Sequence, residues 1–596
     1  MIGKKLPIFF ILINLIVING VILAVMNIRY PIIGHDYTLA LPSLLDLSLH
    51  YRLNGLATQW FTPTFGGGIP IFPNPNTMQY SIPAVLAVFL PPWQAVMLAV
   101  IIQVTAGFLA CYYILYRLLD FHWTSSILGA VFFSASGFMI TRVATGQLGY
   151  FSFPLLPLFL ILLLDNNLPL KLASILFGLL IAFFIYSAGY FIIIIFVLSI
   201  LITLPVVFLI QPGLLQARRL LMTMFVGGVI GGLISLSKLA AAYSFMSHFP
   251  RLVEDQYSTT VLLGLFGIAL QLLGTPTLVP LFLAMGMDPG VFINYSRFAT
   301  GSNYDLWELD ISLTPIVFVF LIIGSVKFLA APRKFIKKLN NPQQIIALGL
   351  SIFFIYLALE FILARGVFYP ILRNLPVLSS LRGNVRFTGA LLFPLMLMAI
   401  YIYHRLTTAR TGSQIISTYI LANLIAVLPL ASYFLFNHDM FLMTYDVRKP
   451  QSIFNQMNTG ESFEVTHIGV TPFKNTGALL YRTSNLNVYE PVFGFKLENF
   501  HPQVKPGSVW EISGDHYNLT DPTGFVYPEL NNNKPFDRFR VTDKAIMEKF
   551  VKHLQPEWNI PTYQRILNWL SGTTLLAALV AVVAQIYILW KKTWSQ

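Results

Sequence analysis

The sequence predicts an α-helical polytopic membrane protein with one small β-rich domain outside the membrane near its C-terminus. Hydrophobic residues make up 56% of the chain and charged residues only 11%, whereas soluble globular proteins carry about 25% charged residues. The apolar residues fall in blocks of about 20, the length with which a helix crosses a bilayer. Residues 437–562 depart from this pattern, because short strand-like runs alternate there with Pro, Gly and Asn.

The first predicted transmembrane helix starts close to the N-terminus. Lys4 and Lys5 precede an apolar run, as in a signal peptide, but no small-residue cleavage site follows before Asn27. We therefore expect an uncleaved helix. We expect about twelve spans altogether, at residues 6–27, 93–118, 125–141, 148–164, 169–186, 190–210, 220–243, 311–331, 345–364, 387–404, 413–436 and 566–590.

Loop charges orient these spans. When the chain is threaded alternately through the membrane, most basic loop residues collect on one face, which the positive-inside rule makes cytoplasmic. They are Lys4, Lys5, Arg117, Lys171, Arg218, Arg219, Lys327, Arg333, Lys334, Lys337, Lys338, Arg405, Arg410, Lys591 and Lys592. Both termini are then cytoplasmic, in a cell inner or plasma membrane. The net charge of +13 reflects this topology and does not indicate a nucleic-acid partner.

The apolar stretch Val261–Ala284 is the exception to simple threading. One added crossing would move the basic run 333–338 to the outer face, so the stretch crosses zero times or twice. Its glycines and prolines favour a re-entrant or interfacial pair of short helices; they are Gly264, Gly267, Gly274, Pro276 and Pro280.

The resulting division of the chain has three parts. Residues 1–436 form a transmembrane module with outer loops at 28–92, 244–310 and 365–386. Residues 437–562 form an extracytoplasmic domain, and residues 563–596 form the last helix and a cytoplasmic tail. In the outer domain a helix is expected to begin near Thr542, and strands are expected at Phe463–Gly469, Ala478–Thr483, Val509–Ser513 and Gly524–Tyr527.

The first outer loop carries an informative order of residues. Asp36 lies a few residues beyond a membrane exit, an amphipathic stretch with Asp46 follows, and Trp60, the triple glycine Gly66–Gly68 and several prolines come next. Further motifs follow along the chain: Arg142 with Gly146-Gln147, Ser235–Arg251, Trp307-Glu308, Leu375–Phe387 and Asn487–Phe495. Taken in this order, they resemble the GT-C superfamily of integral membrane glycosyltransferases, most closely the bacterial YfhO-type membrane proteins.

The resemblance implies a GT-C-like transmembrane module and a glycosyl transfer reaction. The donor would be a polyprenyl-phosphate sugar, the acceptor an envelope glycan, lipid or polymer, and the transfer would invert the anomeric carbon. Where relatives often carry Gly-His, this chain has Gly146-Gln147. Neither the sugar nor the acceptor follows from the resemblance.

Asp36 is the leading candidate for the catalytic base. Transfer from a lipid phosphate needs a general base for the acceptor hydroxyl, and a carboxylate beside the membrane surface lies at the depth of the scissile bond. The alternatives for Asp36 are a solvated loop acid or a helix cap.

Four cationic residues on the outer face are candidates for binding the donor phosphate: Lys238, Arg382, Arg386 and Arg142. Arginine binds phosphate oxygens in a bidentate manner and lysine acts as a point charge. Lys238 could instead snorkel to the membrane surface, and Arg382 and Arg386 could simply anchor a helix at the interface.

Three more acids could serve as a second active-site acid or as ligands for Mg²⁺ or Mn²⁺: Glu308, Asp310 and Asp46. The helix dipole also favours acids at a helix start such as Glu308 and Asp310. Asp36 is followed by Tyr37 rather than lying in an Asp-x-Asp pair, which favours a metal-independent reaction, so no cofactor is assigned. The single cysteine, Cys111, lies in an apolar segment and offers no metal site.

The outer domain is expected to cover the site and to contact the acceptor through Tyr489, Glu490 and Trp510. The chain has no Walker motif, which disfavours an ATP-driven pump. Two alternatives stay open: a carrier or flippase for lipid-linked sugars, and a non-catalytic membrane protein of envelope assembly. Charges at the outer ends of spans favour chemistry at the interface over a path through the bilayer.

Overall fold

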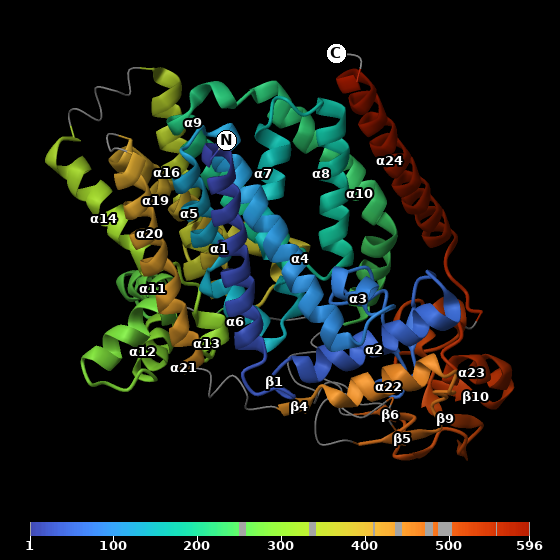
Figure 1. The fold of residues 1–596 in the computed structure, drawn as a ribbon. Coiled ribbons are helices and arrows are strands. Elements are labelled where there is room, and N and C mark those ends of the chain that lie inside the picture. The colour runs from blue at the N-terminus through green and yellow to red at the C-terminus, as the bar shows by residue number, and fades with distance from the viewer. Residues whose placement is uncertain are drawn as a thin grey trace.

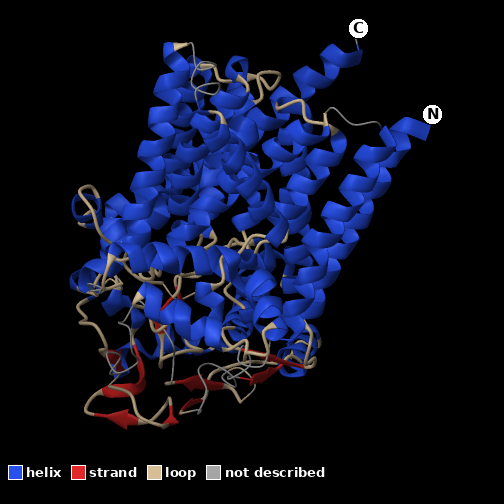
Figure 2. Ribbon diagram, turned by 90° about the vertical axis from the view of Figure 1, so that its left-hand side faces the viewer, coloured by secondary structure: helices blue, strands red, loops and turns tan. Residues whose placement is uncertain are grey.

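The computed structural model describes residues 2–249, 255, 258–332, 341–408, 412–435, 444–470, 479, 481–486, 503–555 and 557–594. Helices dominate, and short strands gather at one end of the molecule (Figure 2).

Nine helical segments of the described chain are long and apolar enough to cross a membrane. They are formed by α1 (Ile2–Met26), α4 (Pro92–Tyr113) with η1 (Ile114–Leu118), α9 (Tyr190–Ile210), α10 (Ala217–His248), α11 (Val261–Ala284), α16 (Pro342–Leu363), η5 (Asn384–Leu391) with α19 (Leu392–Thr407), α20 (Gly412–Val427) with η6 (Leu428–Ala431) and α21 (Ser432–Leu435), and α24 (Thr562–Trp594). The pair α5 (Trp123–Ser134) and α6 (Gly137–Thr145), bent by 40°, makes a tenth candidate.

Shorter apolar helices complete the bundle: η2 (Leu148–Tyr150), η3 (Phe153–Leu155) and α7 (Leu156–Leu164) in series, α8 (Leu170–Tyr186), and α14 (Pro315–Ala330). All the ranges expected from the sequence contain one of these helices. Both termini lie at the same end of the bundle, and the strands lie at the opposite end (Figure 1). This geometry agrees with an even number of crossings between them.

The stretch 261–284 is broken, as its glycines and prolines predict. Gly274 has φ 46° and ψ −159°, so α11 consists of two short helices that meet at a kink. The backbone N–H groups of Thr275 and Ser312 both donate to the carboxylate of Asp310, each at 3.1 Å. A β-carbon at Gly274 would lie 2.4 Å from Asp310 Oδ1. Asp310 is fully buried, and it fixes this kink instead of acting as a second acid or metal ligand.

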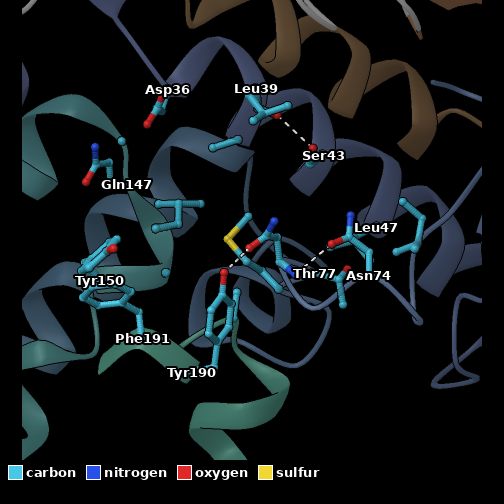
Figure 3. A pocket seen from close by; sticks show the side chains of 18 of the residues that line it. Asp36, Leu39, Ser43, Leu47, Asn74, Thr77, Gln147, Tyr150, Tyr190 and Phe191 are labelled. Atoms are coloured by element: carbon cyan, nitrogen blue, oxygen red, sulfur yellow. Dashed lines mark hydrogen bonds between the residues drawn. The ribbon is translucent and has the colours of Figure 1, made fainter. Parts of the chain in front are cut away.

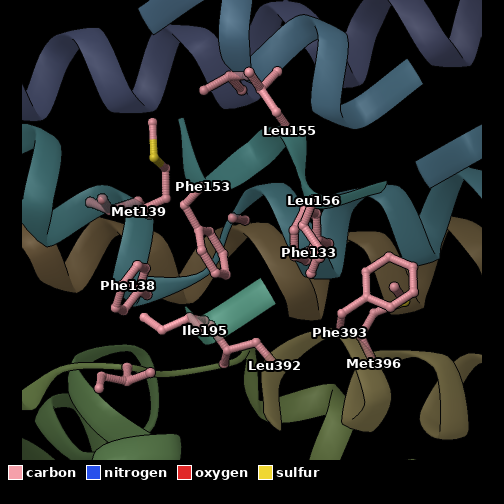
Figure 4. Packing of buried hydrophobic residues seen from close by; sticks show 14 of the residues in the cluster. Phe133, Phe138, Met139, Phe153, Leu155, Leu156, Ile195, Leu392, Phe393 and Met396 are labelled. Carbon is pink, nitrogen blue, oxygen red and sulfur yellow. The ribbon is translucent and has the colours of Figure 1, made fainter. Parts of the chain in front are cut away.

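The core of the bundle is aromatic and aliphatic. Phe133 of α5 packs on Phe153 and on Phe393 of α19, with ring centroids 5.4 Å apart in both pairs. Phe138 of α6 lies 4.6 Å from Phe153, and Leu156 and Met396 fill the space around them (Figure 4). Because buried aromatic rings contribute large apolar areas, this packing fixes the position of α6 and the loop that follows it.

The first outer loop forms α2 (Tyr37–Asn54), α3 (Ile82–Leu86) and the short strands β1 (Ile32–Gly34), β2 (Phe61–Thr62) and β3 (Ile69–Pro70). The short helix η4 (Pro212–Leu214) connects α9 to α10. The segments of the chain expected as outer loops contain α12 (Val291–Thr300), α13 (Leu306–Leu309), α17 (Tyr369–Arg373) and α18 (Pro376–Ser379).

The outer part of the chain contains β4 (Thr444–Asp446), α22 (Arg448–Asn458), β5 (His467–Gly469), β6 (Thr483–Asn485), β7 (Gly507–Ser508), β8 (Ile512–Ser513), β9 (His516–Thr520), η10 (Pro522–Phe525), η11 (Glu529–Asn531), β10 (Arg538–Arg540), η12 (Val541–Asp543) and α23 (Lys544–Val551). Strand β5 lies between β6, which is parallel, and β7, which is antiparallel. Strand β9 pairs with β10 and β8, both antiparallel.

One expected strand of the outer part is wrong. Residues 524–527 fall in and after η10, because Asp521 caps this 3₁₀ helix by accepting from Thr523 N–H, and Pro522 occupies its first turn. The other expected runs each contain or adjoin a short strand. The helix expected near Thr542 begins with η12 and α23.

The first outer loop and the outer part of the chain fold together. Strand β1 pairs antiparallel with β4, and one apolar core joins Phe61, Phe65 and Ile69 of the first loop to residues of the outer part. The triple glycine makes this possible: Gly67 has φ 74°, and a β-carbon there would lie 2.6 Å from Val504. The outer part is therefore not separate from the loop that carries Asp36.

Candidate functional site

One cavity of about 290 Å³ lies where α2, the loop after β3, η2, the start of α9 and the segment before η5 meet. Asp36, Arg382 and Arg386 all line it, with Asp46 at a further position on the same wall. Figure 3 shows Asp36 near Gln147, with the rings of Tyr150 and Phe191 next to each other further along the same side and Tyr190 beside Phe191. Its volume is close to the lower bound of about 300–1,000 Å³ typical of small-molecule sites.

The outer loops 28–92, 244–310 and 365–386 were expected from the sequence to close together around one cavity. The first and the third contribute to its wall, but among the described residues of 244–310 none lines it. The segments 146–150 and 188–191 take that place.

Asp36 lies at the N-terminus of α2, and its carboxylate makes no hydrogen bond to the helix. It is the N-cap residue of α2, but its side chain makes no cap hydrogen bond. Its backbone N–H donates to Thr145 O at 2.9 Å, which ties α2 to the end of α6. The side chain is 28% exposed, and its Oδ1 lies 3.0 Å from His35 Nδ1. The helix-cap alternative therefore does not apply to the Asp36 carboxylate, which is available to a ligand.

His35 lies directly beside this carboxylate. It has φ 58°, in the left-handed region, and its ring packs on Trp307 with centroids 4.2 Å apart. Sequence reasoning gave His35 no role, although its position next to Asp36 was the available signal.

Arg386 presents a held guanidinium to the cavity. Its Nε donates to Glu308 Oε2 at 2.6 Å, its Nη2 donates to Glu308 Oε1, and its Nη1 donates to the Tyr150 hydroxyl at 2.8 Å. Arg382 is beside it, with Nε donating to the Tyr304 hydroxyl at 3.1 Å and the guanidinium 5.3 Å from the Tyr304 ring centroid. Two guanidinium groups thus line the same cavity as the Asp36 carboxylate.

Glu308 links Arg386 to Arg142. Arg142 is fully buried, and its Nη1 donates to Glu308 Oε2 at 2.6 Å and to Gln147 Oε1 at 2.7 Å. Burial alone would raise the pKa of Glu308, but the charges of Arg142 and Arg386 and their hydrogen bonds lower it to about 2. Glu308 is therefore a permanent anion between two arginines, and this geometry suits positioning rather than the second-acid or metal role expected from the sequence.

Lys238 lies behind the cavity wall. Its ammonium donates to the carbonyl oxygens of Phe72 and Asn74, at 2.7 Å for Asn74, and the residue is 2% exposed. Lys238 does not line the cavity, so its ammonium is not placed to bind a phosphate there. It is also buried rather than extended to the membrane surface, as snorkelling would require. A buried ammonium needs such acceptors, and here it fastens the loop after β3.

Asp46 lines the cavity but is already occupied by hydrogen bonds. Gln59 Nε2 donates to it at 2.8 Å and Thr62 Oγ1 at 2.9 Å, and Thr64 Oγ1 donates as well. His553, which follows α23, lies 3.6 Å from Asp46 Oδ1. Burial lowers the pKa of His553, so it stays neutral there. Asp46 therefore holds residues 59–64 of the first outer loop against α2.

The candidate metal ligands do not come together. Asp46, Glu308 and Asp310 each have separate partners, and among the described residues no group of three or more His, Cys, Asp or Glu side chains could hold a metal ion.

The expected acceptor residues divide in two. Tyr489 and Glu490 lie outside the described residues. Trp510 packs edge-on against Tyr517, with centroids 5.8 Å apart, and does not line the cavity.

Comparisons with known proteins add little to this geometry. No protein-family model matches the sequence, and no curated protein does so either. Among solved structures, the fold is similar to the cryo-EM structure of the arabinofuranosyltransferase AftD from Mycobacteria, with a TM-score of 0.40 and 12% sequence identity over 79% of this chain. This chain matches 29% of the length of that enzyme. The function proposed below therefore rests on the residues of the cavity.

Proposed function

We propose that this chain is a membrane glycosyltransferase of the GT-C type, which moves a sugar from a polyprenyl-phosphate donor to an envelope acceptor on the extracytoplasmic face. One observation carries the proposal: a single cavity is lined by the uncapped carboxylate of Asp36 and by the guanidinium groups of Arg382 and Arg386. This is the pair of charges that transfer from a lipid phosphate requires, a base for the acceptor and cations for the leaving group.

In the proposed reaction, Asp36 takes the proton of the acceptor hydroxyl. The hydroxyl oxygen forms a bond to the anomeric carbon as the bond between that carbon and the phosphate oxygen breaks. Both electrons of the broken bond leave with the lipid phosphate, whose negative charge Arg382 and Arg386 stabilise. Glu308 holds Arg386 in place by accepting two hydrogen bonds from its guanidinium.

The location of the cavity supports a lipid donor. It lies toward the end of the helical bundle at which the strands gather, beside the first turns of α2 and α9. A polyprenyl-phosphate sugar carries its scissile bond at headgroup depth, where a cavity at a bundle end can receive it. The loop charges of the sequence predict that this end is extracytoplasmic.

The decisive experiment uses purified protein, a panel of labelled polyprenyl-phosphate sugars and membrane acceptors, and the variant Asp36→Asn. We expect transfer by the wild type and a loss of roughly 10²–10⁴-fold in rate for Asp36→Asn, the usual effect of removing a general base. Asp515→Asn is the matched control, because Asp515 is exposed, has φ 59° and lies in the outer part of the chain. It should transfer at the wild-type rate.

The other outcomes separate the alternatives. Transfer by Asp36→Asn at the wild-type rate would show that Asp36 is not the base. If no protein transfers sugar but the wild type moves lipid-linked sugar across liposome membranes, the chain is a carrier. Absence of both activities over the whole panel favours the non-catalytic role in envelope assembly.

A further inference from the structure

The cavity has a second end, away from the guanidinium groups, and carboxamides form its wall. Gln59, Asn74 and Asn76 line it, and we call these three residues the carboxamide wall. Figure 3 shows Asn74 and Thr77 on the opposite side of the cavity from Asp36, Gln147 and Tyr150. The reaction proposed above gives this wall no role.

Gln59 offers an unused acceptor. Its Nε2 donates to Asp46 Oδ2 at 2.8 Å, and because a carboxylate accepts only, this contact fixes which end of the amide is nitrogen. The Oε1 atom is buried and has no hydrogen-bond partner among the residues that the structure describes. A buried acceptor left unpaired is unfavourable, so a ligand hydroxyl that donates to it would be stabilised.

In the two asparagines, Asn74 and Asn76, the amide nitrogen rather than the oxygen remains for a ligand. Asn74 Oδ1 accepts from the backbone N–H of Asn76 at 2.8 Å, and Asn76 Oδ1 accepts from the Tyr190 hydroxyl at 2.9 Å. Both amide oxygens are thus engaged, and the NH₂ groups are the parts of these side chains that remain as donors to a ligand.

The wall is uncharged and rigid. The acid beside it is Asp46, whose carboxylate already accepts from Gln59, Thr62 and Thr64. The Lys and Arg residues of the described lining are Arg382 and Arg386, and Arg386 donates to Tyr150, on the opposite side of the cavity from Asn74. Lys238 holds the backbone of the wall through the carbonyl of Asn74 at 2.7 Å. A fixed set of one acceptor and two donors matches hydroxyl groups, which both donate and accept.

We propose that the carboxamide wall binds the ring of a neutral, polyhydroxylated sugar, while the phosphate of the same lipid lies against Arg382 and Arg386. This assignment rests on the proposed function and narrows its donor to neutral sugars. A uronic acid would bring a second carboxylate to the end of the cavity that holds Asp46, and the like charges would repel. The nearby Lys238 ammonium lies behind the wall and already donates to the carbonyl oxygens of Phe72 and Asn74.

The test measures equilibrium binding to the full-length protein in lipid nanodiscs, with three probes: polyprenyl phosphate, a polyprenyl-phosphate hexose and a polyprenyl-phosphate hexuronate. We expect the wild type to bind the hexosyl lipid more tightly than the bare lipid phosphate, and the hexuronosyl lipid no more tightly than the bare one. In Asn76→Leu the gain from the hexose should fall by roughly 2- to 10-fold, the effect of one hydrogen bond. Binding of bare polyprenyl phosphate should not change.

Two further variants make the result specific. Tyr190→Phe removes the hydrogen bond to Asn76 Oδ1 but leaves the amide NH₂ in place, so its loss should be smaller than that of Asn76→Leu. Arg386→Met tests the phosphate end, because it should weaken all three probes by the same factor. Gel filtration and the thermal unfolding midpoint check that each variant is folded.

The outcomes distinguish the inference from the function on which it rests. If the hexose adds no affinity over bare polyprenyl phosphate, or if the hexuronate binds more tightly than the hexose, the inference is overturned even when Arg386→Met weakens every probe. If Arg386→Met leaves every probe unchanged while Asn76→Leu selectively weakens the hexosyl lipid, the carboxamide wall stands and the proposed phosphate site fails. Binding of none of the probes overturns both.

Discussion

At the scale of single residues, Glu308 is the carboxylate whose partners matter most. It lies between the buried Arg142 and the cavity-lining Arg386. Removing one member of a buried ion pair costs about 3–5 kcal/mol, because the remaining charge is left without compensation. Removing Glu308 and removing Arg386 are not equivalent. Glu308 pairs with two arginines, whereas Arg386 pairs with Glu308 alone among the described acids.

We therefore predict that Glu308→Gln destabilises the protein more than Arg386→Met. The first substitution leaves two guanidinium groups with no carboxylate between them, whereas the second leaves the Arg142–Glu308 pair intact. Thermal unfolding of both variants in the same detergent, compared with the wild type, measures the order. Equal losses, or a larger loss for Arg386→Met, would contradict the arrangement described here.

The pKa of Glu308 also gives a pH prediction. Its folded value of about 2 lies below the unfolded value of about 4.3. The stability that it contributes is thus fully present above about pH 4.3 and is lost as the pH falls toward 2. The difference in unfolding midpoint between wild type and Glu308→Gln should stay constant from about pH 5 to 8. A difference that shrinks within that range would mean that Glu308 is not paired as seen.

The sequence predicted on which face of the molecule a charged residue lies better than it predicted the groups to which that residue bonds. The order of Asp36, Arg382 and Arg386 along the chain, together with the spans between them, predicted a common face, and these three residues do line one cavity. Lys238 shares that face, yet its ammonium bonds to two carbonyl groups. Which neighbour a buried charge selects depends on backbone groups that sequence spacing cannot locate, and the same holds for the carboxamides of Gln59 and Asn74.

At the scale of elements, the kink in α11 depends on the carboxylate of Asp310. We predict that Gly274→Ala destabilises the protein, because the new methyl group would lie 2.4 Å from Asp310 Oδ1 and φ is 46°. Gly228→Ala in α10 is the matched control, since a β-carbon there meets nothing within 4 Å. A helix-interior alanine of this kind stabilises by roughly 0.5–1 kcal/mol relative to glycine.

Unfolding midpoints of the two alanine variants test this contrast. A Gly274→Ala protein as stable as Gly228→Ala would show that α11 is not held at its kink. The break itself was predictable, because glycine and proline interrupt the apolar run. The group that holds the break was not, since Asp310 lies 36 residues after Gly274 in the chain and the helix dipole offered a simpler reason for its presence.

At the scale of the whole molecule, the outer part and the first outer loop share one apolar core. The sequence suggested a domain boundary at residue 437, because composition changes there. Composition cannot show that Phe61, Phe65 and Ile69 pack against residues beyond that boundary. Strands as short as β1 and β4 carry almost no sequence signal alone. The outer part therefore depends on residues that precede it by most of the chain.

We predict that Phe65→Ala loosens the outer part of the chain. Phe65 is 2% exposed, and truncating a buried phenylalanine costs about 3–5 kcal/mol. Limited proteolysis should cut residues 503–555 faster in this variant than in the wild type. Leu56→Ala, at a position that is 83% exposed, should be cut at the wild-type rate. Equal protection of Phe65→Ala and wild type would mean that the outer part folds without the first loop.

The pairing of the first loop with the outer part sets an order of events during synthesis. Arg52 bonds to Asn458, 406 residues later, and the Gly67 N–H donates to Ser484, 417 residues later. At about 5–20 residues per second, the loop that carries Asp36 waits roughly 20–80 s after translation before these partners exist. During that interval Phe61 and Phe65 lack the residues with which they form a core, so the nascent chain is open to aggregation and proteases at this step. The residues that line the cavity all lie between 36 and 386, so they are synthesised before the partners that hold the first loop in place.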